Sequence, residues 1–201
     1  MRAISICAIG ALGLLAAGCV DVRPIHYYTI GTPPAPVAPA ARSASSGPAL
    51  LVGNISVPLE LRDDRIRYRI GSNEVGAYQF HRWVDRPGTM VSESLVQALR
   101  ASGKYRSVME ANSSAAGDYI VRGRLFEFDE VDRETIQTSI SLRVDLVNAN
   151  TREVVWGDLV KREEPVASKN ITAVVASLDR NLQVVVKETA EGSGHFLEAQ
   201  R

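Results

Sequence analysis

Residues 136–146 form the most regular stretch of the sequence, a strand with two different faces. One face carries Ile136, Thr138, Ile140, Leu142, Val144 and Leu146, and the other carries Gln137, Ser139, Ser141, Arg143 and Asp145. Because side chains alternate between the two faces of a strand, this pattern predicts a half-buried strand. Its apolar face has to be covered, so the rest of the chain must supply a sheet and a second layer.

Other strands are expected on both sides of this stretch. Residues 148–151 predict a turn, after which residues 154–160 return as a hairpin partner that ends at Pro165. Apolar runs at 50–57 and 119–128 predict two further strands.

A second hairpin is expected from residues 65–70 and 75–83, joined by a turn at 71–73. Its first strand places Ile66, Tyr68 and Ile70 on one face and Arg65, Arg67 and Arg69 on the other. Like charges in a row repel one another, and therefore favour a complementary partner or solvent. The three arginines are a candidate partner face, and the alternative is a solvated sheet face.

Two amphipathic helices are expected to cover this sheet. The first begins near Pro87 with Asp85 as its expected N-cap, and ends at Gly103. Its apolar face carries Val91, Leu95, Ala98 and Leu99. The second begins at the N-cap Asn170 and is expected to fade at Gly192 and Gly194. Its apolar positions are Ile171, Val174, Val175, Leu178, Leu182 and Val185.

The order of these elements is strands, helix, strands, helix. It predicts one α+β domain over residues 49–201, with a mostly antiparallel or mixed sheet built from hairpins and two amphipathic helices packed on it.

The N-terminal segment has the layout of a bacterial lipoprotein signal over residues 1–18. Arg2 is followed by an uncharged apolar run at 3–15, by small residues and then by Cys19. Such a run is too short for a stable transmembrane span. The small residues before Cys19 resemble a lipobox, which implies cleavage before Cys19 and attachment of diacylglycerol and palmitate there. The alternative is an ordinary signal peptide that happens to contain Cys19.

Residues 19–48 would then hold the lipid anchor, a short strand at 25–30 and a Pro/Ala-rich spacer or long loop. With Cys7 removed and Cys19 modified, the mature chain would have no disulfide. In lipoproteins resembling this one, Val20 after the cysteine directs the protein to the outer membrane. Asp21 can instead signal retention in the inner membrane.

No pattern of residues indicates catalysis or a cofactor. His26, His81 and His195 lie in different segments without ligands at metal-binding spacing, and no serine lies in a Gly-x-Ser-x-Gly turn. The acidic run at 127–134 lacks the pattern of a calcium loop, so a solvated strand end is expected there. The chain has 23 basic and 23 acidic residues, a balance that does not favour nucleic acid.

Several short motifs occur in a characteristic order along the chain. After the lipobox come Tyr27, Tyr28 and Ile30, then Ile55-x-Val57-Pro58, Asn73-Glu74-Val75, Arg82-Trp83, the first helix and Val155-Trp156. In this order and spacing the chain resembles the ABC-type transport auxiliary lipoproteins, which accompany phospholipid transporters built around mammalian-cell-entry (MCE) domains. Residues 84–87 depart from the family pattern, where a small or acidic residue and an earlier proline are expected.

The resemblance implies a non-catalytic periplasmic lipoprotein of the outer membrane that contacts an MCE protein of an ABC transporter and phospholipid, and that forms a ring of copies. The alternatives are a ligand- or lipid-binding lipoprotein and a structural plug or assembly factor of an outer-membrane complex. The motif residues Tyr28, Arg82, Trp83 and Trp156 are expected to be structural. Trp83 should pack the hairpin against the first helix, and Arg82 should either pair with an acidic residue or mark a partner surface.

Overall fold

The computed structural model describes residues 23–31, 47–111 and 116–200. Residues 1–22, with the lipobox and Cys19, and most of the Pro/Ala-rich segment lie outside the described residues.

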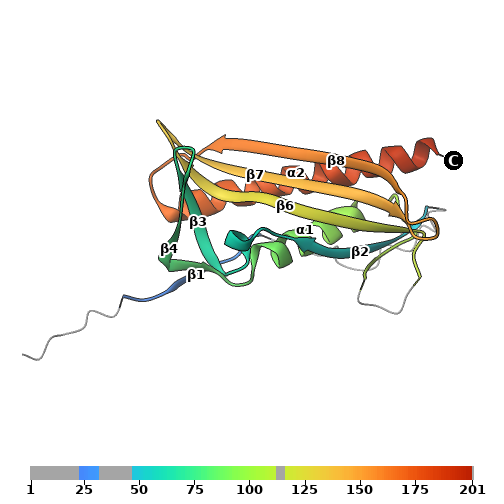
Figure 1. Ribbon diagram of the computed structural model, residues 1–201, viewed down its shortest axis with the longest axis horizontal. Helices are drawn as coiled ribbons and strands as arrows, with labels where there is room; N and C mark the ends of the chain where they lie inside the picture. Colours follow the sequence, from blue (N-terminus) through green and yellow to red (C-terminus); the bar gives the residue numbers. More distant parts are fainter. Residues whose placement is uncertain (1–22, 32–46, 112–115, 201) are drawn as a thin grey trace, which may run out of the picture.

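The described chain forms one mixed eight-stranded sheet with two long helices on one of its faces (Figure 1). In chain order the elements are β1 (His26–Tyr28), β2 (Ala49–Ser56), the 3₁₀ turn η1 (Leu59–Leu61), β3 (Arg65–Ile70), β4 (Glu74–Trp83), α1 (Pro87–Ala101), β5 (Ser107–Glu110), β6 (Tyr119–Asp132), β7 (Ile136–Asn148), β8 (Val154–Pro165) and α2 (Ile171–Ala199). This architecture confirms the expected α+β class and both expected hairpins.

The long strand β6 organises the sheet. On one side it pairs antiparallel with β7, which pairs antiparallel with β8. On its other side it pairs parallel with two strands in succession, β2 along its first half and β3 near its end. The turn η1 lies between β2 and β3, so these two strands act as one interrupted neighbour of β6. The sheet continues through β5 beside β2 and through β4 and β1 beside β3.

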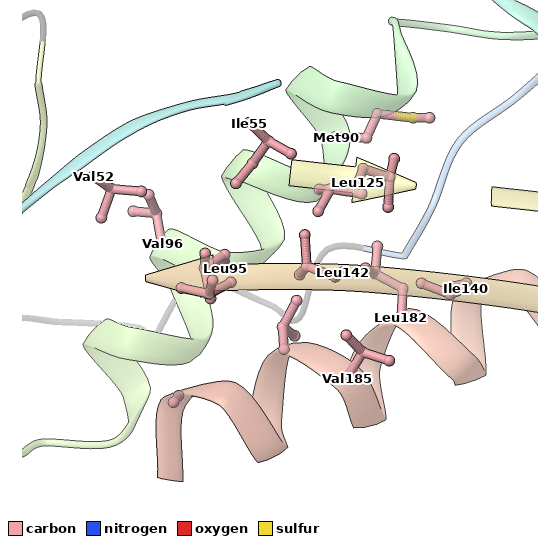
Figure 2. Packing of buried hydrophobic residues seen from close by; sticks show 14 of the residues in the cluster. Val52, Ile55, Met90, Leu95, Val96, Leu125, Ile140, Leu142, Leu182 and Val185 are labelled. Atoms are coloured by element: carbon pink, nitrogen blue, oxygen red, sulfur yellow. The ribbon is translucent and has the colours of Figure 1, made fainter. Parts of the chain in front are cut away.

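The core lies between the sheet and the helices. Ile140, Leu142 and Leu146 of β7 are fully buried, as their alternation predicted, but Ser139 and Ser141 on the other face are buried too, so the strand is covered on both faces there. Figure 2 shows Leu142 between Leu95 of α1 and Leu182 of α2. Because each apolar side chain buried in this layer contributes roughly 1.5–3 kcal/mol, the two helices and the sheet stabilise one another.

Of the two predicted helix N-caps, one is confirmed and the other is wrong. Asn170 caps α2 as predicted, since its side-chain oxygen accepts a hydrogen bond from the Ala173 N–H at 2.9 Å. Asp85, in contrast, is not the N-cap of α1: Arg86 holds that position without a side-chain cap, and the Asp85 carboxylate accepts a hydrogen bond from the Arg86 N–H. Pro87 in the first turn has no N–H that needs a partner, and its fixed φ angle suits the start of a helix.

The second helix does not fade at Gly192 and Gly194 but continues to Ala199. At Gly192 the indole ring of Trp156 approaches so closely that a Cβ atom would lie 3.3 Å from it. At Gly194 the side chain of Lys104 occupies the space of a Cβ atom. These glycines therefore permit Trp156 and Lys104 to pack closely against the helix, and tertiary contact outweighs the low helix propensity of glycine.

The short strand β1 belongs to the folded body. It pairs parallel with β4, and the chain after it remains attached, because Val84 N–H donates to the Tyr28 carbonyl at 2.8 Å and Gln183 Nε2 donates to the Gly31 carbonyl at 2.9 Å. Residues 32–46 therefore connect two strands of one sheet. Whether the Pro/Ala-rich segment is a spacer or a long loop stays a prediction, and only residues 20–25 separate β1 from Cys19.

Candidate functional site

The three arginines of β3 lie on the sheet face opposite the helices. Ile66 is fully buried, as the predicted alternation requires, but Tyr68 is only half-buried and Ile70 is 43% exposed, so the predicted apolar face is wrong for the end of the strand. Arg65 does not stand free, since its guanidinium forms a 2.6 Å ion pair with Asp63 at the start of the strand. Both side chains of this pair are about 40% exposed (43% and 40%), and such pairs contribute little stability.

Arg69 reaches across to β6. Its Nη2 donates to Asp129 Oδ2 at 2.8 Å, and its Nη1 lies 3.9 Å from Glu127 Oε1. The Asp129 side chain is only 4% exposed. Burial raises the pKa of Asp129, against the opposing hydrogen bond and charge of Arg69. Arg69 is therefore the cation that compensates a buried carboxylate.

The network continues over β7 and β8. Ser139 Oγ donates to Glu127 Oε2 at 2.6 Å, and Lys161 Nζ lies 3.3 Å from Glu127 Oε2 and 3.1 Å from Glu163 Oε1. Burial would raise the pKa of Glu127, but the Ser139 hydrogen bond and the Lys161 charge more than offset it and lower that pKa. The expectation of a solvated acidic strand end is wrong for Asp129 and Glu130, which are 3% and 5% exposed.

This face is consequently mixed in charge. Around the arginine row the structure places the cations Arg65, Arg67, Arg69 and Lys161 and the carboxylates Asp63, Glu127, Asp129 and Glu163. Arg67 has a buried Nε atom without a hydrogen-bond partner among the described residues. The row therefore cannot act as an isolated basic stripe, and its role as a partner face stays a prediction that concerns Arg65 and Arg67 first.

Three of the four motif residues meet where β1 joins β4. In the parallel register Tyr28 lies opposite Trp83, and Arg82 is its neighbour. Arg82 Nη1 donates to Asp64 Oδ1 at 2.9 Å, which selects the acidic-partner alternative for this residue. Trp83 is 1% exposed, and its ring centroid lies 5.4 Å from that of Phe128 on β6. The fourth, Trp156, lies on β8 against Gly192 of α2, apart from the other three.

The same junction brings together two histidines that sequence analysis kept apart. His26 and His81 lie opposite each other in the register, and their rings stack with centroids 5.4 Å apart. Tyr28 Oη and His81 Nδ1 are 3.0 Å apart. Burial, and then the charge of His26, lower the pKa of His81. His195 lies elsewhere, near Glu198 on α2.

The buried carboxyl group of Glu130 also lies near this junction. Tyr78 Oη donates to Glu130 Oε2 at 2.7 Å, and the Tyr78 ring stands edge-on to His81. Burial raises the pKa of Glu130, while the hydrogen bond from Tyr78 opposes that shift. The only sequence signal for this cluster was its residue types, because the parallel pairing of β1 with β4 cannot be read from local periodicity.

The comparisons with known proteins agree with this fold. The family model of the ABC-type transport auxiliary lipoprotein component matches residues 28–190. The chain belongs to this family. No curated protein matches the sequence.

Two solved structures share the fold of this auxiliary lipoprotein. A crystal structure of a Xanthomonas campestris protein is 21% identical, with a TM-score of 0.76, and the match covers 87% of this chain and 98% of that one. A second crystal structure, of an uncharacterized protein, is 13% identical with a TM-score of 0.66, over 85% of this chain and 99% of the other. At these identities the likeness shows the fold alone.

The described surface of the auxiliary lipoprotein offers a hollow of about 350 Å³ between β2 and the start of α1. Its lining mixes Ile55, Val57 and Leu61 with Arg62, Arg86 and Glu93. Within residues 23–31, 47–111 and 116–200, no group of three or more histidine, cysteine, aspartate and glutamate side chains could hold a metal ion. In the same ranges, no helix is long and apolar enough to cross a membrane.

Proposed function

We propose that this protein is a non-catalytic, lipid-anchored component of an MCE-type ABC system that moves phospholipid. The observation that carries the proposal is membership of the auxiliary lipoprotein family over residues 28–190. The lipobox at Cys19 adds a covalent membrane anchor, and Val20 after it favours the outer membrane. In this role the folded body is a periplasmic binding module for the transporter and for further copies of itself.

The partner contact must come from the folded body. Residues 32–46 hold a single charge, Arg42, and no aromatic side chain, so this segment offers few groups that could form an interface core. The body, in contrast, displays polar and charged side chains across the sheet face opposite the helices, including the arginine row. Because the face carries both signs of charge, complementary charges on a partner would fix its orientation there, with Arg65 and Arg67 as the cations it contacts first.

Co-purification from native membranes tests the function. The full-length protein, isolated from the membranes of its own cells with mild detergent, should bring down an MCE-domain protein of an ABC transporter. Recovery of a β-barrel assembly in its place would support the structural alternative and refute the proposal.

The arginine row is tested by neutralising Arg65 and Arg67 together with glutamine while Arg69 is kept. Arg69 is spared because removing it would leave the buried Asp129 carboxylate without its cation and confound folding with binding. Recovery of the MCE protein should fall, and fall more at low salt, where charges are screened less. The matched control is Arg143→Gln, which removes from the same sheet face on β7 an arginine whose side chain is 50% exposed, against 43% for Arg65. Equal recovery of the MCE protein with both variants would show that the arginine row is not part of the interface.

A further inference from the structure

The position of β1 limits how far the folded body can stand from its anchor. Seven peptide units link Cys19 to His26, and an extended chain spans at most about 3.3–3.6 Å per residue, which gives roughly 25 Å. The strand β7 alone has 13 residues, about 43 Å at the usual rise of a strand. A lipid on Cys19 therefore keeps the β1 end of the body close to the membrane, whereas the far end of the long strands can stand well away from it.

Three exposed large apolar side chains lie at this end. Ile25 and Tyr27 are 45% and 60% exposed, and their spacing of two puts them on the same side of the chain. Tyr27 lies opposite Arg82 in the register, and Val84, which is 60% exposed, follows β4 directly and donates its N–H to the carbonyl of the neighbouring Tyr28 at 2.8 Å. Tyrosine beside aliphatic groups is typical of side chains at a membrane surface, where one end of the ring is apolar and the other is wet.

The charges around these side chains do not select a strongly charged partner. The hollow next to Val84 is lined by Arg62 and Arg86 and by Asp63, Asp64 and Asp85, while Arg82 is paired with Asp64. With both signs present in similar number, attraction at this surface has to come from apolar contact.

We infer that the β1 end of the body rests on the bilayer that holds the anchor, with Ile25, Tyr27 and Val84 against its surface. This inference rests on the proposed lipidation of Cys19. The tether sets the distance and the three side chains set the orientation. The β7–β8 turn, at the opposite end of the long strands, then points away from the membrane toward the periplasm (Figure 1).

Fluorescence quenching by labelled lipids tests this orientation in the full-length, lipidated protein. Single cysteines are introduced by Tyr27→Cys, by Val84→Cys and, as the control, by Asn150→Cys in the β7–β8 turn. All three positions are exposed, so the substitutions should preserve the fold, which circular dichroism checks. The thiol of lipidated Cys19 is blocked and Cys7 leaves with the signal peptide, so a thiol-reactive fluorophore labels only the introduced residue.

The labelled proteins are reconstituted in vesicles of phosphatidylethanolamine and phosphatidylglycerol that contain spin-labelled lipid with the quencher at headgroup depth. The probes at residues 27 and 84 should be quenched several-fold more than the probe at residue 150, and raising the salt concentration should not reduce the difference. Equal quenching at the three positions, or stronger quenching at residue 150, would overturn the inference. The inference would also be overturned if residue 27 is protected from the thiol reagent in native membranes but its probe is not quenched in vesicles. That result indicates a protein partner at residue 27.

Flotation of the vesicles and the mass of the purified protein report the anchor separately. A protein that floats but shows no difference between positions keeps its anchor and loses the proposed orientation. A protein that carries no lipid on Cys19 refutes both.

Discussion

Replacing Arg69 by leucine should destabilise the fold strongly, because it leaves the Asp129 carboxylate buried without its cation. Breaking a buried ion pair by removing one partner costs about 3–5 kcal/mol. For a chain of this size one kcal/mol shifts the melting temperature by about 2–4 °C, so melting should fall by roughly 6–20 °C. Arg65→Leu is the matched control on the same strand. Its partner Asp63 is 40% exposed, and a solvated pair contributes about 0–1 kcal/mol.

The measurements are thermal melting and urea unfolding of the soluble protein without residues 1–19, and the urea series is repeated between neutral and acidic pH. In Arg69→Leu the folded-state pKa of Asp129 should rise further above its unfolded value, because burial then acts unopposed by Arg69. The folded state then binds a proton more readily than the unfolded state, so this group lowers stability as the pH rises through that interval. The loss relative to the unsubstituted protein should consequently be largest at neutral pH and shrink as the solution is acidified.

Removing both charges of the pair tests whether the uncompensated Asp129 carboxylate causes the loss of stability. In Arg69→Leu with Asp129→Leu no buried charge remains uncompensated, and most of the lost stability should return. The reasoning is refuted if Arg69→Leu and Arg65→Leu cost the same, or if the cost of Arg69→Leu does not change with pH.

Three further outcomes are expected. Cys19→Ser should abolish incorporation of labelled palmitate, and unchanged labelling would contradict the lipobox assignment. The soluble protein should melt at the same temperature with and without dithiothreitol, because it contains no cysteine; a shift of several degrees would mean that its processing is misread. Leu95→Asp should unfold the domain, since Leu95 is fully buried and an unpaired buried charge costs several kcal/mol of a total near about 5–15 kcal/mol. Thr89→Asp, at an exposed position of the first turn of α1, should fold normally. If both variants unfold, α1 does not tolerate a new aspartate at either position, and the result does not identify Leu95 as part of the buried face.

The sequence by itself determined the elements whose signals are local. The alternation over residues 136–146 assigned the buried face of β7 correctly, and the apolar spacing of Val91, Leu95 and Leu99 assigned that of α1. Asn170 could be recognised as a cap because its hydrogen bond closes within three residues. Each of these signals depends on neighbours a few positions away, which a single sequence displays directly.

Only the tertiary structure decided which distant segments meet. The parallel pairing of β3 with β6 turned an acidic run into buried partners of an arginine, and the pairing of β1 with β4 stacked His26 on His81. The helix α2 continues through Gly192, where it packs against Trp156, although the low helix propensity of glycine predicted an end there. In each case the energy comes from contacts between residues far apart in the chain. Many strand registers share one hydrophobic pattern, so local periodicity cannot choose among them, and burial in the folded body does.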